Sequence, residues 1–254
     1  MSRDTDRVIE SRHNPRFKDL KRLDSGKAIR KSGEALLSGR RLIQEAVRIH
    51  PERCRALITA PGYETRLEDP PSHLAEYRLT PELLRELDTL GTRHPLLLVD
   101  VPPFPRWSPE SGLPDGATLF VPFQDPENVG AVVRSGVAFG VGGFVMLAES
   151  AHPFHPKAAR AASGAVLAAK FLQGPSLADL PEELDLIPLS VEGADIGEFE
   201  FPATFGLLPG IEGAGLPPRW RARSVRIPIG PSVESLNAAA AVSIALHVWS
   251  GRLR

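Results

Sequence analysis

The sequence predicts an α/β protein with two domains, and three observations lead to that class. Its 254 residues, 42% of them apolar, supply enough hydrophobic material for one or two cores. The second half alternates continuous apolar runs with helical segments, which is typical of a parallel sheet covered by helices on both faces. A proline-rich stretch separates that half from a smaller front part. We therefore expect one domain on each side of the prolines.

The front part has the pattern of a small α/β domain over residues 1–101. Spaced Leu, Ile and Ala among basic side chains predict two amphipathic helices within Pro15 to Val47, separated near Ser25-Gly26. Three shorter elements follow: a strand over Arg55 to Thr59, a helix over Pro81 to Leu90 with Thr80 as its N-cap, and a buried strand over Leu96 to Val101.

The stretch from Pro102 to Pro114 contains five prolines, which exclude regular structure and indicate a stiff connection. We expect a linker over residues 102–116 on which the first domain swings, and a second domain over 117–254. The elements expected there are strands at Thr118 to Phe123, Gly143 to Ala148, Leu184 to Ser190, Thr204 to Leu208 and Ser224 to Ile229, and helices at Asn128 to Phe139, Pro156 to Ala165 and about Ser235 to Trp249.

Composition excludes several classes of protein. The single cysteine, Cys54, rules out a disulfide framework and favours a reducing compartment, so we expect a cytoplasmic protein. The longest Gly/apolar stretch, Ser135 to Ala148, is too short to span a bilayer. Net charge is −1, but residues 1–60 hold 15 basic against 8 acidic side chains, and the remainder holds 15 against 23. A polyanion can dock on the basic front, although a solvated helical face explains the same charge.

Three segments of the second half carry polar residues or glycines where strands end. Asn128 and Arg134 follow the strand at 118–123, with Asn128 able to cap the next helix. Gly210, Glu212 and Gly215 follow the strand at 204–208, where glycines let backbone approach a ligand or another segment. Ser235 and Asn237 open an alanine-rich helix. Asparagine is a poor helix former, and nothing in the neighbouring sequence explains its presence in the first turn. Each segment alone also fits an ordinary cap, tight turn or surface arginine.

Taken together, the three segments resemble the motifs of the SpoU/TrmH family of RNA 2′-O-ribose methyltransferases, in the SPOUT superfamily. Asn128-x-Gly-x-x-x-Arg134, Gly210-x-Glu212-Gly-x-Gly215 and Ile227-Pro…Ser235-Leu-Asn237 occur in the family's order. The resemblance implies a trefoil-knotted, parallel-sheet catalytic domain, S-adenosylmethionine as cofactor, a homodimer, and an L30e-like first domain that binds RNA. The RNA would be ribosomal or transfer RNA, and the alternative is a catalytically idle RNA-binding protein of the same fold.

The resemblance also assigns residues. It implies catalytic roles for Asn128, Arg134, Glu212, Ser235 and Asn237, and cofactor contacts from Leu208, Gly210, Ile227, Ile229 and Leu236. Because deprotonating an arginine at neutral pH costs about 7 kcal/mol, we expect Arg134 to grip RNA phosphate and polarise the hydroxyl rather than act as the base. The basic residues expected to bind RNA are Arg12, Arg16, Lys18, Lys21 and Arg22. His152 and His155 lie in a proline-rich loop, and we expect no metal.

Overall fold

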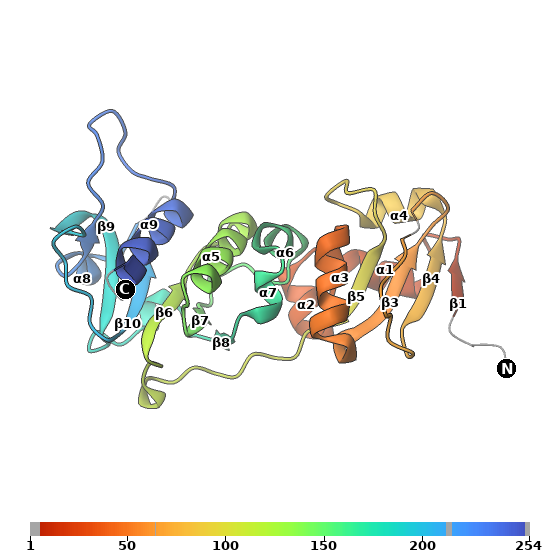
Figure 1. The fold of residues 1–254 in the computed structure, drawn as a ribbon, viewed down its shortest axis with the longest axis horizontal. Coiled ribbons are helices and arrows are strands. Elements are labelled where there is room, and N and C mark those ends of the chain that lie inside the picture. Colours follow the sequence, from red (N-terminus) through yellow and green to blue (C-terminus); the bar gives the residue numbers. More distant parts are fainter. Residues whose placement is uncertain (1–5, 64, 212–214, 252–254) are drawn as a thin grey trace. The chain divides into compact units, whose positions relative to one another are not determined.

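The computed structural model describes residues 6–63, 65–211 and 215–251 (Figure 1). Contacts within the chain divide it into two compact units. Unit 1 comprises Met1–Pro103 together with His152–Leu167, and unit 2 comprises Phe104–Ala151 together with Ala168–Arg254. The two units are described separately.

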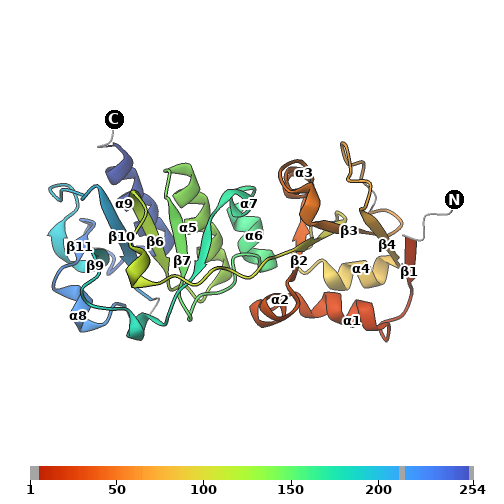
Figure 2. The ribbon, with the colours of Figure 1, turned by 90° about the horizontal axis from the view of Figure 1, so that it is seen from below.

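Unit 1 is built on a mixed sheet of five strands: β1 (Asp6–Ile9), β2 (Glu34–Ser38), β3 (Cys54–Thr59), β4 (Ala75–Leu79) and β5 (Leu96–Asp100), in the order β1-β4-β3-β5-β2. β4 runs parallel to β1 and β3, and β5 is antiparallel to β2 and β3. Its helices are α1 (Pro15–Arg22), α2 (Gly26–Ser32), α3 (Arg40–Ile49) and α4 (Pro81–Leu87), with a 3-10 turn at Pro51–Arg53. Figure 2 shows α1, α2 and α4 on one side of this sheet and α3 on the other.

The sequence predicted part of unit 1 correctly. The strands at β3 and β5 are confirmed, and so is α4, whose N-cap Thr80 accepts a hydrogen bond from the Leu83 amide at 3.4 Å. The helix from Pro15 and the predicted break near Ser25-Gly26 are confirmed, because α1 ends at Arg22 and α2 begins at Gly26. The expectation of a single second helix up to Val47 is wrong, because strand β2 lies between α2 and α3. Gly33 ends α2 with a left-handed φ of 69°, and the buried residues of β2 continued an apolar pattern that fits a helix equally well. β1 and β4 were not predicted.

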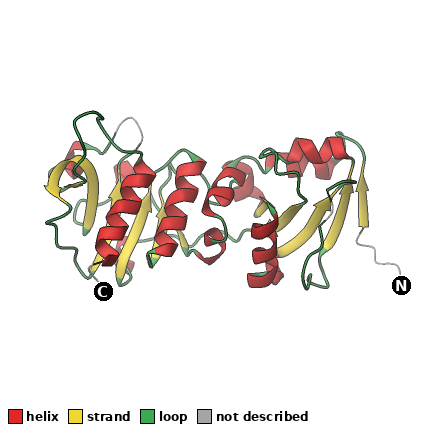
Figure 3. Ribbon diagram, turned by 45° about the horizontal axis from the view of Figure 1, so that its top comes forward, coloured by secondary structure: helices red, strands yellow, loops and turns green. Residues whose placement is uncertain are grey.

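Unit 2 contains a six-stranded sheet in the order β11-β9-β10-β6-β7-β8. All its strand pairs are parallel, as the sequence predicted, but β8 was not among the five predicted strands. The strands are β6 (Gly116–Val121), β7 (Gly143–Met146), β8 (Phe171–Gln173), β9 (Leu186–Asp195), β10 (Thr204–Pro209) and β11 (Val225–Arg226). Helices α5 (Pro126–Ala138) and α9 (Ala238–Gly251) pack side by side, and α8 (Pro218–Arg221) is short (Figures 1 and 3). Several predicted bounds shift. β11 is two residues long, α9 begins at Ala238, and Asp125 rather than Asn128 caps α5. β7 ends at Met146, β9 extends to Asp195 and α6 ends at Ala162.

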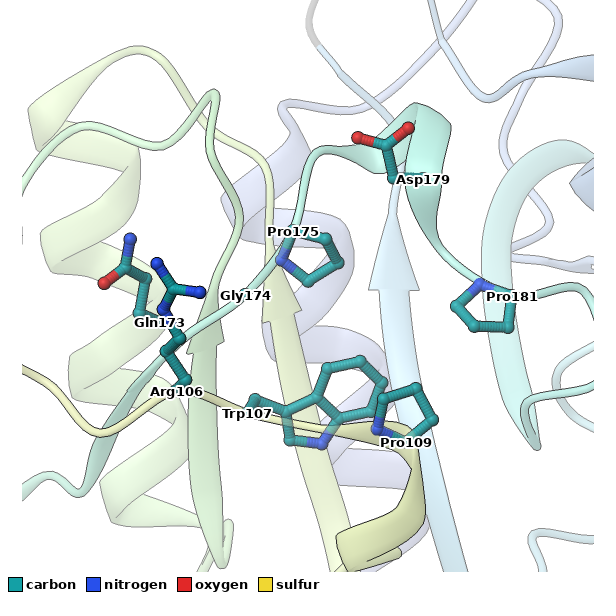
Figure 4. A pocket seen from close by; sticks show the side chains of 8 residues that line it. All are labelled: Arg106, Trp107, Pro109, Gln173, Gly174, Pro175, Asp179 and Pro181. Atoms are coloured by element: carbon teal, nitrogen blue, oxygen red, sulfur yellow. The ribbon is translucent and has the colours of Figure 1, made fainter.

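The proline-rich stretch is partly packed rather than a free tether. Its backbone pairs with β8, since the Trp107 amide donates to the Gln173 carbonyl at 2.9 Å and the Gln173 amide donates to the Pro105 carbonyl at 2.8 Å. The Trp107 indole is 8% exposed and packs edge-on against Phe120, 5.1 Å between ring centroids. With Gln173, Asp179 and three prolines, Arg106 and Trp107 line a surface pocket of about 390 Å³ (Figure 4). The proline-rich stretch from Phe104 to Pro114 therefore belongs to unit 2.

A second departure from the predicted division concerns residues 152–167, which were expected in the second domain. This segment contains α6 (Pro156–Ala162) and all of α7 (Ala165–Ala168) except its last residue. Helix α6 contacts β2 of unit 1. His50 Nε2 lies 3.0 Å from the Leu167 carbonyl oxygen, and Arg160 donates to the Leu90 carbonyl at 3.2 Å. Small residues on α6 permit this close packing, because Ala158, Ala159 and Ala162 are all buried.

Candidate functional site

Unit 2 holds a cleft of about 920 Å³ at the carboxyl ends of its strands. Parallel α/β sheets bind their ligands at this edge, because the loops that leave the strands converge there. The lining comes from the end of β9, the loop after β10, the segment from β11 to α9 and the first turn of α5. Its residues are Asp125, Asn128, Leu189–Glu192, Pro209–Ile211, Gly215, Leu216, Arg221, Val225, Ile227, Ile229, Glu234–Ala238 and Ala241.

Two asparagines join segments that lie more than one hundred residues apart. Asn237 Nδ2 donates to Asn128 Oδ1 at 3.1 Å. The other amide atom of Asn237, Oδ1, accepts from the backbone N–H groups of Ala239 and Ala240 at 3.0 and 3.1 Å. Asn237 is thus the N-cap of α9, which explains an asparagine at a position where the sequence suggested no local reason. One side chain caps a helix and fixes one wall of the cleft to another.

The loop after β10 folds tightly on itself at the cleft. The Gly215 amide donates to the Ile211 carbonyl at 2.8 Å, and the Ile211 amide donates back at 3.3 Å. A Cβ on Gly210 would lie 3.3 Å from the Gly215 carbonyl carbon, which is closer than most Cβ atoms approach a neighbour, and at ordinary contact distance, 3.5 Å, from the Leu216 nitrogen. Gly215 itself has φ of 67°, which favours glycine. The close backbone approach predicted for these glycines is present, and it is an approach of this chain to itself.

Most of the predicted cofactor and catalytic residues meet at this cleft. Those that line it are Asn128, Gly210, Ile227, Ile229, Ser235, Leu236 and Asn237. Leu208 does not, because it is fully buried in the core beside Phe120 and Trp220. Arg134 is exposed on α5 and is not part of the lining, and no described residue forms an ion pair with it. Glu212 lies outside the described residues.

The cleft also contains polar residues that the sequence did not single out. Arg221 lines it and donates from Nε to the Leu216 carbonyl at 3.0 Å, which ties α8 to the glycine loop. Ser190, Glu192 and Glu234 supply further hydroxyl and carboxylate groups. Ser190, Glu192 and Arg221 stand in segments without a motif, so only the fold brings them to the site, whereas Glu234 directly precedes Ser235 of the third motif. Apolar Leu189, Leu216 and Ile227 complete a mixed lining.

Four of the five basic residues expected to bind RNA form ion pairs within unit 1. Arg16 forms two hydrogen bonds with the Glu34 carboxylate, at 2.8 and 3.0 Å, and the hydrogen bond to Glu34 raises the pKa of Arg16. Arg12 and Lys21 share the Glu86 carboxylate, and Arg22 lies 3.1 Å from Asp19. Lys18 is exposed, and no described carboxylate pairs with it.

The two histidines after β7 have structural positions. His152 is buried, and its Nδ1 accepts from the Phe154 amide at 3.2 Å. Burial, with a smaller contribution from the charge of Arg30, lowers the pKa of His152 to about 3. His155 caps α6 by accepting from the Lys157 amide at 3.3 Å.

Within the described ranges, no helix is both long and apolar enough to cross a membrane.

An open parallel sheet with a cleft at its carboxyl edge, lined by a glycine loop and two capping segments, is the arrangement in which α/β proteins bind small ligands. Comparison with known proteins gives the family. The model of the SpoU rRNA Methylase family matches residues 118–247, and the chain belongs to that family.

Relatives and solved structures agree with this assignment. The chain is 51% identical over 251 residues to the "Ribosomal RNA small subunit methyltransferase G 2" of Syntrophobacter fumaroxidans, covering 98% of this chain and 50% of that protein. It therefore spans half the length of that relative. It is 26% identical to the Bacillus subtilis 23S rRNA (guanosine(2553)-2'-O)-methyltransferase RlmP, covering 96% of this chain and 99% of that one. The crystal structure of the SpoU methyltransferase AviRb from Streptomyces viridochromogenes, in complex with AdoMet, shares the fold, with a TM-score of 0.78, 24% identity, and coverage of 95% and 98%.

Proposed function

We propose that this protein transfers a methyl group from S-adenosylmethionine to a ribose 2′-hydroxyl of ribosomal or transfer RNA. The observation that carries the proposal is the hydrogen bond from Asn237 to Asn128, which joins the first and third family motifs at one cleft. Family membership and the 2′-O-methyltransferase name of the Bacillus subtilis relative support the same activity.

The cleft fits the cofactor in size and chemistry. Its volume of about 920 Å³ lies within the range of small-molecule sites. Leu189, Leu216 and Ile227 offer apolar contact for a purine ring, and the loops around Gly210 and Leu236 bring backbone N–H and C=O groups to the surface of the cleft. When bound, the cofactor supplies a methyl group already activated on a sulfonium sulfur.

The chain's own residues then have to position the RNA and assist loss of the hydroxyl proton. Asn128 and Asn237 hold the first turns of α5 and α9 in fixed relation, and Ser235 lies at the same wall of the cleft. We assign Glu212 to orientation of the ribose or of Arg134. Arg134, exposed on α5, grips RNA phosphate from outside the cofactor cleft, because its guanidinium fork matches phosphate oxygens.

The proposal includes a homodimer in which α9 takes part. This helix contains no charged residue, yet Ala240, Ile244 and His247 are exposed along one side, Ile244 to 37%. An apolar helix face of this kind is stabilised when a second copy covers it.

We further propose the trefoil knot of the family in unit 2, an L30e-like RNA-binding role for unit 1, and a cytoplasmic location, where RNA and the cofactor both occur.

Two substitutions of Asn237 test the proposal. Ser caps helices about as well as Asn but is too short to reach Asn128, so Asn237→Ser should keep the melting temperature and lose at least about 10-fold in methyl transfer. Asn237→Ala should also lose about 1 kcal/mol of stability through the missing cap. The measurements are thermal unfolding, calorimetry with S-adenosylhomocysteine, and transfer of labelled methyl to RNA. A folded wild-type protein that binds RNA but no cofactor would favour the idle RNA-binding alternative.

A further inference from the structure

Unit 1 carries two groups of cations on neighbouring helices that differ in their partners. On α1 and the turn before it, Arg12, Arg16, Lys21 and Arg22 pair with carboxylates of the same unit. The carboxylates beside these side chains cancel much of their positive charge, so the local potential that would attract a phosphate is reduced. The ion pairs therefore make this group a poor docking surface for a polyanion.

The second group lies on α2 and has no carboxylate partner among the described residues. Lys27, Arg30 and Lys31 are all exposed, and their spacing of three and four residues places them on one face of the helix. Within the described chain, none of the three forms an ion pair with a carboxylate. Like charges at this spacing repel each other and destabilise a helix, so local folding gives no reason for them.

Another unpaired cation lies on the segment that packs against α2. A Cβ on Gly26, the first residue of α2, would lie 3.0 Å from the Cβ of His152, so the turn before α6 touches the start of α2. Lys157, in the first turn of α6, is exposed and, in the part of the chain that the structure describes, has no carboxylate partner. Asp24 interacts with His155, in the turn before α6. We call Lys27, Arg30, Lys31 and Lys157 the α2/α6 cation patch.

We propose that the α2/α6 cation patch is the surface of unit 1 that docks the phosphate backbone of the RNA substrate, in place of the paired cations of α1. The inference rests on the proposed function for its ligand. Charge complementarity identifies that ligand: phosphates repeat along a strand, and side chains three and four residues apart on a helix meet successive charges of such a polymer. Contacts of this kind position RNA without selecting its sequence.

The test is fluorescence anisotropy of the full-length protein with a fluorescein-labelled RNA stem–loop, as a function of salt. A patch variant, Lys27→Gln with Arg30→Gln and Lys31→Gln, is compared with two variants of equal charge loss. One is an α1 variant, Arg12→Gln with Lys21→Gln and Arg22→Gln. The other is a control with the paired arginines Arg53, Arg78 and Arg85 changed to Gln.

The patch variant should bind about 10-fold more weakly at physiological salt, and the slope of log K against log salt should fall by about 2, since each lost phosphate contact removes about 0.7 to 0.9. The control should change affinity by less than about 2-fold, and the α1 variant should resemble the control. Equal losses in all three variants, or a larger loss in the α1 variant, overturn the proposal.

Cofactor binding separates this inference from the proposed function. The patch variant should bind S-adenosylhomocysteine as the wild type does, because the cleft belongs to unit 2. If the wild type transfers methyl to RNA and the patch variant binds RNA equally well, only the patch is wrong. If the wild type binds RNA through the patch yet takes up no cofactor, the patch stands and the proposed activity fails.

Discussion

The two units differ in how the structure places the residues that the sequence singled out for function. In unit 2, three short motifs spread over more than a hundred residues converge on one cleft, and Asn128 and Asn237 meet at 3.1 Å. In unit 1, an excess of basic residues pointed to a docking surface, but most of the residues chosen are paired with carboxylates. The spacing of residues at strand ends therefore predicts geometry, whereas a count of charges does not show which charges are free.

The largest effect is expected from Gly210→Val. A branched side chain would meet the backbone of Gly215 and Leu216, displace the glycine loop and abolish cofactor binding. The control is Gly230→Val in the same wall region, where an added Cβ meets nothing within 4 Å. Calorimetry with S-adenosylhomocysteine measures both. Normal binding by the Gly210 variant would show that the cofactor lies elsewhere.

The next effect concerns Arg134, which is exposed and outside the cleft lining. Arg134→Ala should lower methyl transfer by about 100-fold or more, since a positioned charge is lost, while the melting temperature and cofactor affinity stay the same. Arg134→Lys should recover little, because an ammonium cannot reproduce the two-pronged contact of a guanidinium. Near-normal transfer by the alanine variant would make Arg134 an ordinary surface residue.

Trp107 tests whether the proline-rich stretch belongs to unit 2. Trp107→Ala should cost about 3 to 5 kcal/mol of stability, because a buried indole is removed from a core that includes Phe120. A chain that starts after residue 110 should be destabilised in the same way, and it also loses the sheet on which α6 packs. Chemical denaturation gives the free energy. A loss below about 1 kcal/mol would favour the stiff, unpacked linker that the prolines suggested.

The smallest effect is a pH dependence from His152. Its pKa is lowered to about 3 in the folded chain, so the unfolded state takes up the proton first and stability falls as pH drops below about 6.5. Between pH 7.5 and 5.5 the loss should be about 1 kcal/mol. His152→Asn keeps an acceptor for the Phe154 amide and should flatten this part of the profile. An unchanged slope would mean that the segment around His152 is not buried on unit 1.

The sequence predicted those parts of the fold in which local pattern and tertiary role agree. The apolar runs at β6, β7 and β10 are buried strands, and Gly140, with φ of 80°, follows α5 as expected. β2 was missed because its buried residues continue the apolar pattern of the preceding helix, and only its pairing with β5 settles its conformation. A short window of the sequence contains no information on long-range strand pairing of this kind.

The same limit applies to the candidate site. Asn128, Gly210 and Asn237 were found because each stands at a strand end or a helix start, where a local rule marks it. Arg221 was missed because it reaches the cleft only through the position of α8, and Leu208 was misplaced because its strand continues into the core. Ion pairing on α1 depends on Glu34 and Glu86, which lie on other elements.

The central claim is that the cleft of unit 2 serves transfer to a ribose hydroxyl. The most direct measurement incubates the full-length protein with S-adenosylmethionine carrying a labelled methyl group and unmodified ribosomal or transfer RNA, digests the RNA to nucleosides and identifies the labelled product by mass spectrometry. The account predicts label in a 2′-O-methylated nucleoside with wild-type protein and almost none with Gly210→Val. Label on a base, or equal label with the Gly210 variant, would contradict it.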